Sequence, residues 1–261
     1  MFDFHMHSRV SFDSTADPAA MVAAAEKAGL KAICFTDHLD YDPLAAEQTM
    51  LFDTNEYNDA YDSLRSDSVE IYRGMEFGML PDNRETFRQD LQRRHFDFVI
   101  GSVHFTGGLD PYFPEFWEGK TLDQAIRANL QETLTCVRNH DDFDVLGHIT
   151  YIAKTKCNPV KRPVELAPYR DLVDEIFKTL IAKGKGIEVN TGGVDICGAY
   201  LPERDYLLRF KELGGRIVTV GSDAHDAGRV GQYCLDAAKM VNDIFGYVCT
   251  FCDRQPVFHR I

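Results

Sequence analysis

Seven short apolar runs in this chain each lead into polar residues of the kinds that bind metal ions or act in catalysis. The runs and the residues that follow them are Phe2–Phe4 with His5 and His7, Ala32–Phe35 with Asp37 and His38, Val69–Met75 with Glu76, Phe98–Val103 with His104, Val145–Gly147 with His148, Ile187–Val189 with Asn190, and Ile217–Val220 with Asp223 and His225. Seven such coincidences in order predict strands whose C-terminal ends converge on one polar site, which is where α/β barrels carry their chemistry.

Amphipathic segments separate these runs. The segments that we expect to be helical are Pro18–Ala28, Asn55–Ser66, Asn83–Arg93, Thr121–Arg138, Val164–Lys183, Glu203–Glu212 and Arg229–Phe245. Repeated alternation of strand and helix predicts a parallel sheet. Polar residues at one end of every strand favour closure into a barrel, because an open sheet gathers its ligands mainly at one switch point.

The length of 261 residues is ordinary for one α/β barrel, so residues 1–261 are expected to form a single domain. An apolar content of 44% is enough for a sizeable core. The last stretch, Tyr247–Ile261, is interpreted as two short strands that form a small hairpin on the outside.

Charge and cysteine content limit the partners and the compartment. A net charge of −13 argues against a large nucleic-acid interface, although a few local cations can still hold a small phosphorylated substrate. Seven scattered cysteines indicate reduced thiols rather than a disulfide framework, and we interpret Cys249 and Cys252 as strand residues rather than a redox pair. We see no signal peptide and no apolar stretch of membrane-spanning length, and we expect a cytoplasmic protein.

The spacing of the polar residues fits a metal site. His5 and His7 point to the same face of a strand because side chains alternate with period two, and Asp223 and His225 repeat this geometry on the strand that closure would place alongside. Imidazole and carboxylate groups bind divalent cations. Glu76 follows an apolar strand, where a carboxylate is costly to bury unless cations surround it. Each residue alone could be an ordinary surface or core residue, and their shared position is what favours a site.

Two long connections, Gly107–Lys120 and Ala153–Pro163, follow strands that end in these histidines. Both are expected to overhang the site, since long loops in compact domains are often functional. The alternative is that either loop is only a solvated connection.

The chain resembles the polymerase and histidinol phosphatase (PHP) superfamily of metal-dependent phosphoesterases over essentially its whole length. The motifs that carry the resemblance are His5-Met6-His7, Thr36-Asp37-His38, Glu76, Gly101-Ser102-Val103-His104, Gly147-His148 and Gly221-Ser222-Asp223-Ala224-His225. The resemblance implies a distorted seven-stranded (β/α)7 barrel with two or three divalent ions, which the ligand types allow to be Zn, Mn or Fe.

The resemblance also implies how the ligands divide. The first ion would be held by His5, His7, Glu76 and Asp223, the second by Glu76, His104 and His148, and the third by Asp13, His38 and His225. Asp13 could instead be a loop residue. A water that bridges two cations becomes a hydroxide nucleophile near neutral pH, so the expected activity is hydrolysis of a phosphate monoester. Glu76, Asp13 and His225 are the expected catalytic residues, the last two as candidate acids for the leaving group.

Within the superfamily the chain is most similar to the histidinol phosphatases, which release phosphate from L-histidinol phosphate in histidine biosynthesis. This similarity lies in Phe96–Phe105, Gly108–Asp110, Phe116–Lys120 and Phe143–His148. An acidic loop with Asp110, Glu115 and Glu118 could receive a cationic amine or imidazole. The expected substrate-binding residues are Lys154, Arg162 and Asn190.

Two positions depart from that subgroup. Lys154 stands where the subgroup usually has a phosphate-binding Arg, and Asp195 stands near a second position where it tends to have Arg. Lys156, Arg162 or Arg204 could supply the missing charge. Another small phosphate ester, a nucleotide phosphodiester, or a metal-binding domain without catalysis are therefore alternatives.

Overall fold

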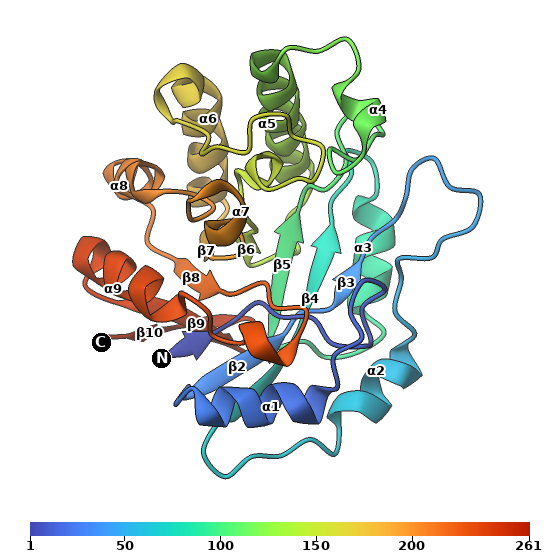
Figure 1. Ribbon diagram of the computed structural model, residues 1–261, viewed down its shortest axis with the longest axis vertical. Helices are drawn as coiled ribbons and strands as arrows, with labels where there is room; N and C mark the ends of the chain where they lie inside the picture. Colours follow the sequence, from blue (N-terminus) through green and yellow to red (C-terminus); the bar gives the residue numbers. More distant parts are fainter.

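Seven parallel strands form a nearly closed barrel in the computed structural model, which describes residues 1–261 (Figure 1). In their order around the barrel, the strands are β1 (Phe2–Asp3), β2 (Ala32–Phe35), β4 (Glu70–Gly78), β5 (Phe98–Ser102), β6 (Val145–Leu146), β7 (Gly186–Asn190) and β8 (Val218–Gly221). Each of these strands coincides with one of the seven apolar runs. The predicted (β/α)7 barrel is therefore confirmed.

Backbone hydrogen bonds at the C-terminal ends of the first and last strands bring the two edges of the sheet together. The amide of Phe4 donates to the carbonyl of Val220 at 3.0 Å, and the amide of Asp223 donates to the carbonyl of His5 at 2.8 Å. An additional short strand, β3 (His38–Leu39), pairs with the end of β4 in parallel register, with His38 opposite Glu76. Two of the expected metal ligands, His38 and Glu76, therefore lie opposite each other on neighbouring strands.

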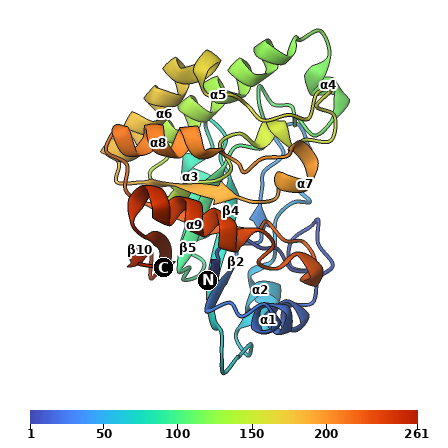
Figure 2. The same cartoon turned by 60° about the vertical axis from the view of Figure 1, so that its left-hand side comes forward.

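The structure has nine helices, of which the longer ones lie around the outside of the strands (Figures 1 and 2). Both chain ends lie beside the C-terminal hairpin. The helices are α1 (Pro18–Lys27), α2 (Thr54–Tyr61), α3 (Arg84–Leu91), α4 (Pro114–Trp117), α5 (Leu122–Asn139), α6 (Arg170–Ala182), α7 (Val194–Cys197), α8 (Arg204–Glu212) and α9 (Cys234–Phe245). None of them is both long enough and apolar enough to cross a bilayer.

Two helices begin later than their sequence patterns predicted. The segment expected from Val164 becomes α-helical only at Arg170, because Pro168 lacks the amide that a helix interior needs and sits in a 3-10 turn, η2 (Ala167–Tyr169). The segment expected from Arg229 becomes helical only at Cys234. Gly231 and Tyr233 there have φ values of 72° and 59°, which a right-handed helix excludes.

The C-terminal hairpin consists of β9 (Val248–Cys252) and β10 (Gln255–His259), which pair antiparallel. It lies outside the barrel, as predicted, and its Phe251 is buried with the ring stacked on that of Phe98 at 4.9 Å. The hairpin therefore packs against the N-terminal end of the barrel. Cys249 and Cys252 are strand residues, as interpreted, and all seven cysteines are free.

Candidate metal centre

All nine side chains expected to bind metal meet at the C-terminal ends of the strands. Candidate ligand atoms lie within 4.8 Å of one another in four overlapping groups: His5, His7 and Asp223; His5, Glu76 and His148; His7, Asp13, His38 and His225; and His38, Asp40 and His104. The pair His5 and His7 follows β1, and the pair Asp223 and His225 follows β8, the strand beside β1. The structure thus gathers residues from the whole length of the chain into one polar cluster.

Glu76 lies at the centre of this cluster and is fully buried. Its Oε2 atom is 3.1 Å from Nε2 of His5, whereas its Oε1 atom is 2.8 Å from Nε2 of His148 and 3.3 Å from Nε2 of His104. Burial alone would raise the pKa of Glu76, yet the surrounding histidines hold the pKa well below its usual range. A carboxylate that stays ionised, with its two oxygens facing different sets of imidazoles, has the geometry of a bridging ligand.

Several of the histidine rings in this cluster lie directly against one another. The ring of His7 stacks between those of His38 and His225, at centroid distances of 4.4 and 4.3 Å. Burial, together with His225 and His38, lowers the pKa of His7 to about 3. A neutral imidazole keeps a lone pair for a metal ion, and metal binding requires that form. The donor set of nitrogens and carboxylate oxygens therefore suits divalent transition metals.

Asp40 and Glu188 support the histidines from behind, and the sequence analysis did not select either of them. The Nδ1 atoms of His38 and His104 lie 2.9 and 3.1 Å from Asp40 oxygens, and Nδ1 of His5 lies 2.6 Å from Oε1 of Glu188. Carboxylates in this position fix the tautomer and orientation of a metal-binding imidazole. Asp40 lies two residues after His38, and Glu188 lies two residues before Asn190. Because side chains alternate with period two along a strand, this spacing could have indicated that both carboxylates face the site.

Two glycines make room for this supporting shell. A Cβ atom at Gly78 would lie 1.7 Å from Oδ1 of Asp40, and one at Gly221 would lie 2.2 Å from Cβ of His5. Any side chain at these positions would displace groups that hold the histidines. The glycines that end β4 and β8 are therefore required by close approach at the site.

A cavity of about 560 Å³ opens over the metal centre. The loop Gly107–Lys120 contributes Asp110, Tyr112 and Phe113 to its lining, and the loop Ala153–Pro163 contributes Lys154 and Thr155. Both loops therefore overhang the site, as expected.

Of the three expected substrate-binding residues, only Lys154 lines the cavity. It forms an ion pair with Asp223. Asn190 is fully buried and does not line it: its Nδ2 donates to Oδ2 of Asp223 at 3.1 Å, so it orients that carboxylate instead. Arg162 is exposed and lines a separate small hollow beside Tyr169, so the structure does not bring it to the cavity. Sequence proximity to Lys154 suggested Arg162, but the loop carries it away.

Asp13 and His225 lie together at the cavity edge. Oδ2 of Asp13 is 2.9 Å from Nε2 of His225 and 3.5 Å from Nε2 of His38. Burial opposes protonation of His225, but the hydrogen bond that its Nε2 donates to Asp13 and the charge of Asp223 raise its pKa.

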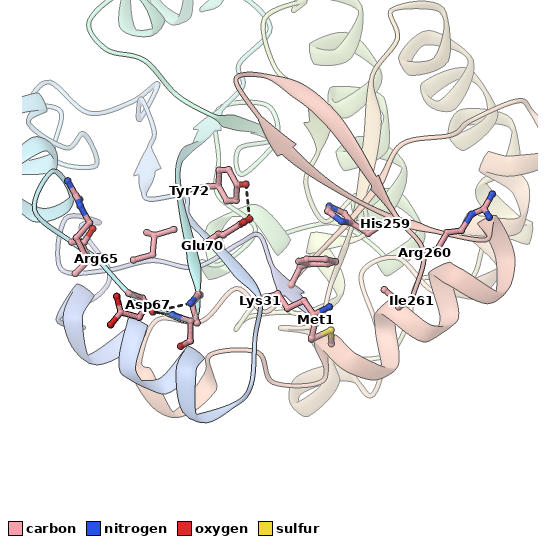
Figure 3. Close-up of a pocket in the computed structure, with 15 residues that line it drawn as sticks. Met1, Lys31, Arg65, Asp67, Glu70, Tyr72, His259, Arg260 and Ile261 are labelled. Atoms are coloured by element: carbon pink, nitrogen blue, oxygen red, sulfur yellow. Dashed lines mark hydrogen bonds between the residues drawn. The ribbon is translucent and has the colours of Figure 1, made fainter.

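A second hollow, of about 870 Å³, lies at the opposite end of the barrel (Figure 3). Its charged lining residues come from the starts of strands and from the chain ends, and they include Lys31, Arg65, Glu70 and Arg260. Figure 3 shows Arg65 and Arg260 at opposite sides of a broad face, and the carboxylate of Glu70 accepts a hydrogen bond from the hydroxyl of Tyr72 at 3.0 Å. None of the nine expected metal-binding residues lines it.

Comparison with known proteins agrees with this geometry. The PHP domain family model matches residues 3–192. A probable histidinol-phosphatase of Clostridium acetobutylicum is 30% identical over 99% of this chain and 96% of its own length. The histidinol-phosphatase of Lactococcus lactis is 34% identical over 87% of this chain and 85% of its own length.

A solved structure extends the similarity to the whole fold. The crystal structure of the Lactococcus lactis histidinol phosphate phosphatase, in complex with zinc, L-histidinol and phosphate, superposes with a TM-score of 0.88 and 30% identity over 98% of each chain. The family match covers most of the barrel, and the metal centre occupies the same end of the strands that the motifs indicated. The chain therefore belongs to the PHP domain family of metal-dependent phosphatases.

Proposed function

We propose that this protein hydrolyses L-histidinol phosphate to L-histidinol and inorganic phosphate, a step of histidine biosynthesis. The observation that carries the proposal is the position of Glu76, whose two buried oxygens face separate sets of imidazoles on the floor of a substrate-sized cavity. The relatives named histidinol-phosphatase support the choice of substrate. Such an enzyme would work in the cytoplasm, which cell fractionation would check.

We infer that two or three divalent ions bind, with zinc the first candidate because the Lactococcus lactis structure contains it. His5, His7, Glu76 and Asp223 would hold one ion, Glu76, His104 and His148 a second, and Asp13, His38 and His225 a third. Bound ions lower the pKa of a water molecule and offset charge on the phosphoryl group. Glu188 and Asp40 hold the imidazoles in register for this arrangement.

The residues of the cavity divide by charge in a way that suits this substrate. Lys154 lies beside Asp223 and supplies positive charge near the phosphate. Asp110 is half-buried in the overhanging loop beside Tyr112 and Phe113, and it would receive the cationic amine or the imidazole. Glu115 and Glu118 do not line the cavity, so of the three acids in this loop Asp110 is the one suited to bind substrate.

A group at the cavity edge could protonate the leaving alkoxide. Asp13 and His225 form a hydrogen-bonded pair there, and His225 has a raised pKa and so carries a proton at higher pH than a free imidazole. The pair remains our candidate for the general acid when the third ion is absent.

The test is a turnover assay on a panel of phosphate esters, with metal analysis of the same sample. The panel contains L-histidinol phosphate, several small sugar and amino-alcohol phosphates, and a dinucleotide phosphodiester. We expect the highest kcat/KM for L-histidinol phosphate. A higher kcat/KM for another ester would replace the substrate, and no hydrolysis of any ester by fully metal-loaded protein would overturn the proposal.

A further inference from the structure

Lys154 and Arg229 are the lysine and arginine side chains that line the cavity over the metal centre. Lys154 is already ion-paired with Asp223. The guanidinium of Arg229 has no hydrogen-bond partner in the protein: the nearest carboxylate oxygen, Oδ2 of Asp195, is 3.7 Å from its Nη2 atom, which is beyond hydrogen-bond reach. Arg229 therefore offers free donors at the cavity wall.

The chain turns sharply after His225 and brings Arg229 to the cavity. Asp226 begins a 3-10 turn, η3 (Ala227–Arg229), and its Oδ1 atom accepts the amide of Gly228 at 2.9 Å. The amide of Arg229 donates to the carbonyl of Asp226 at 3.1 Å. The turn is thus fixed locally, immediately after an expected metal ligand.

Asp195 anchors the segment that follows this turn. It lies in α7, beyond β7, and accepts hydrogen bonds from the hydroxyl of Tyr233 at 2.7 Å and from Nε2 of Gln232 at 3.1 Å. Tyr233 has a φ of 59°, a left-handed conformation that is rare and strained for a bulky residue. Strain of this kind persists only where the surroundings hold it, and it concentrates at functional sites.

The charges that line the cavity indicate what Arg229 could bind. The cavity floor contains Glu76 and Asp223, and a phosphate dianion there needs cationic donors on the side away from the metal ions. Lys154 is partly neutralised and offers a point charge, whereas an arginine can engage two phosphoryl oxygens at once. Arg229 is the lining group with that capacity.

We propose that Arg229 binds the phosphoryl group of the substrate and that Asp195 is the positioning residue that holds Arg229 over the cavity. This inference rests on the proposed function, because it takes a phosphate ester as the substrate. It also accounts for an acid near the position where the related subgroup tends to have an arginine: the acid orients a cation supplied by a different loop.

The first experiment measures phosphate binding directly. Inorganic phosphate is titrated calorimetrically into metal-loaded protein, and KM and kcat are measured on whichever ester the parent hydrolyses. We expect Arg229→Ala to raise both the Kd for phosphate and the KM at least about tenfold, with a smaller change in kcat, and Arg229→Lys to recover part of the loss. Arg260→Ala, an exposed arginine at the opposite end of the barrel, is the matched control and should leave all three unchanged.

The second experiment tests the positioning role by a double-mutant cycle. Asp195→Ala should raise the phosphate Kd about threefold to fivefold in the parent and cause no further rise in Arg229→Ala, because its effect passes through that arginine. Metal content should stay constant in every variant. A phosphate Kd within twofold of the parent for Arg229→Ala overturns the inference, and equal effects of Asp195→Ala in both backgrounds overturn the positioning role. Phosphate binding is measured independently of the substrate, so failure of L-histidinol phosphate as the substrate leaves this test intact.

Discussion

The two ends of the barrel each have a hollow, and the larger one is the weaker candidate for chemistry. At the N-terminal ends of the strands, about 870 Å³ is lined by exposed charges such as Arg65 and Glu70, whose partners are neighbours in the sequence or solvent (Figure 3). At the C-terminal ends, about 560 Å³ lies over fully buried Glu76 and His5, which come from different strands. Burying such groups is costly unless each is paired, so their gathering marks the functional end more reliably than volume does.

Removal of the metal ions should produce the largest loss of activity, and it should affect only the C-terminal end of the barrel. Chelation is expected to lower turnover at least about a thousandfold, equivalent to ~4 kcal/mol of barrier. It should also lower the melting temperature, because ions that bind only the native state stabilise it. Turnover, elemental analysis and thermal unfolding before and after reconstitution with Zn or Mn measure these effects. Fewer than one ion per chain after reconstitution would contradict the metal centre.

Glu76→Gln should cost more activity than any single substitution among the histidines. Glutamine keeps the shape but removes the charge that faces imidazoles on both sides. The matched control is Glu70→Gln on the same strand, whose carboxylate is exposed in the opposite hollow. Turnover of the Glu76 variant within about tenfold of the parent, or ~1.4 kcal/mol of barrier, would show that Glu76 does not bridge.

Asp40→Asn should weaken metal binding without changing the packing. Asp40 contacts the Nδ1 atoms of His38 and His104 and fits against Gly78 with no spare room, so asparagine is the substitution that preserves shape. Loss of a supporting carboxylate typically lowers metal affinity about 10–100-fold. Competition with a chromogenic chelator measures the affinity, and parental affinity would mean that Asp40 does not orient these histidines.

Much of the metal centre could be predicted from the sequence because short sequence patterns specify its strands and the side chains at their ends. An apolar run followed by a ligand fixes a strand and its polar end, and period two fixes which side chains share a face. The seven strands and the convergence of nine side chains followed from this pattern and from the resemblance. Asp40 follows the same period but was missed, because its run, β3, is only two residues long.

The errors and omissions lie where distant parts of the chain meet. Arg162 follows Lys154 in the same loop, but the loop path places it at another hollow. Arg229 was assigned to a helix, although positive φ at Gly231 and Tyr233 delays that helix and leaves the arginine at the cavity. The burial of Phe251 under the barrel likewise depends on Phe98, which is far away in the sequence. Local periodicity contains no information on any of these contacts.

Lys154→Ala should moderately weaken binding of the phosphate group and leave the metal centre unchanged. It is expected to weaken binding of the substrate and of inorganic phosphate together, about tenfold, while metal content stays unchanged. Lys154→Arg should retain or improve binding, because a guanidinium engages two phosphoryl oxygens. Steady-state kinetics with phosphate as inhibitor provide the measurement. Parental kinetics and parental inhibition in the alanine variant would mean that this loop does not contact the phosphate.

The smallest effect is expected at the other end of the barrel. Lys31→Ala and Arg65→Ala remove positive charge from the larger hollow, which lies across the barrel from Glu76. Exposed charges of this kind contribute little to stability and are screened by salt, so we expect turnover, phosphate inhibition and metal content all within about twofold of the parent. Kinetics at two salt concentrations separate a local effect from a long-range electrostatic one. A severalfold change that persists at high salt would show that the N-terminal hollow is coupled to catalysis, and volume rather than buried charge would then have been the better guide to function.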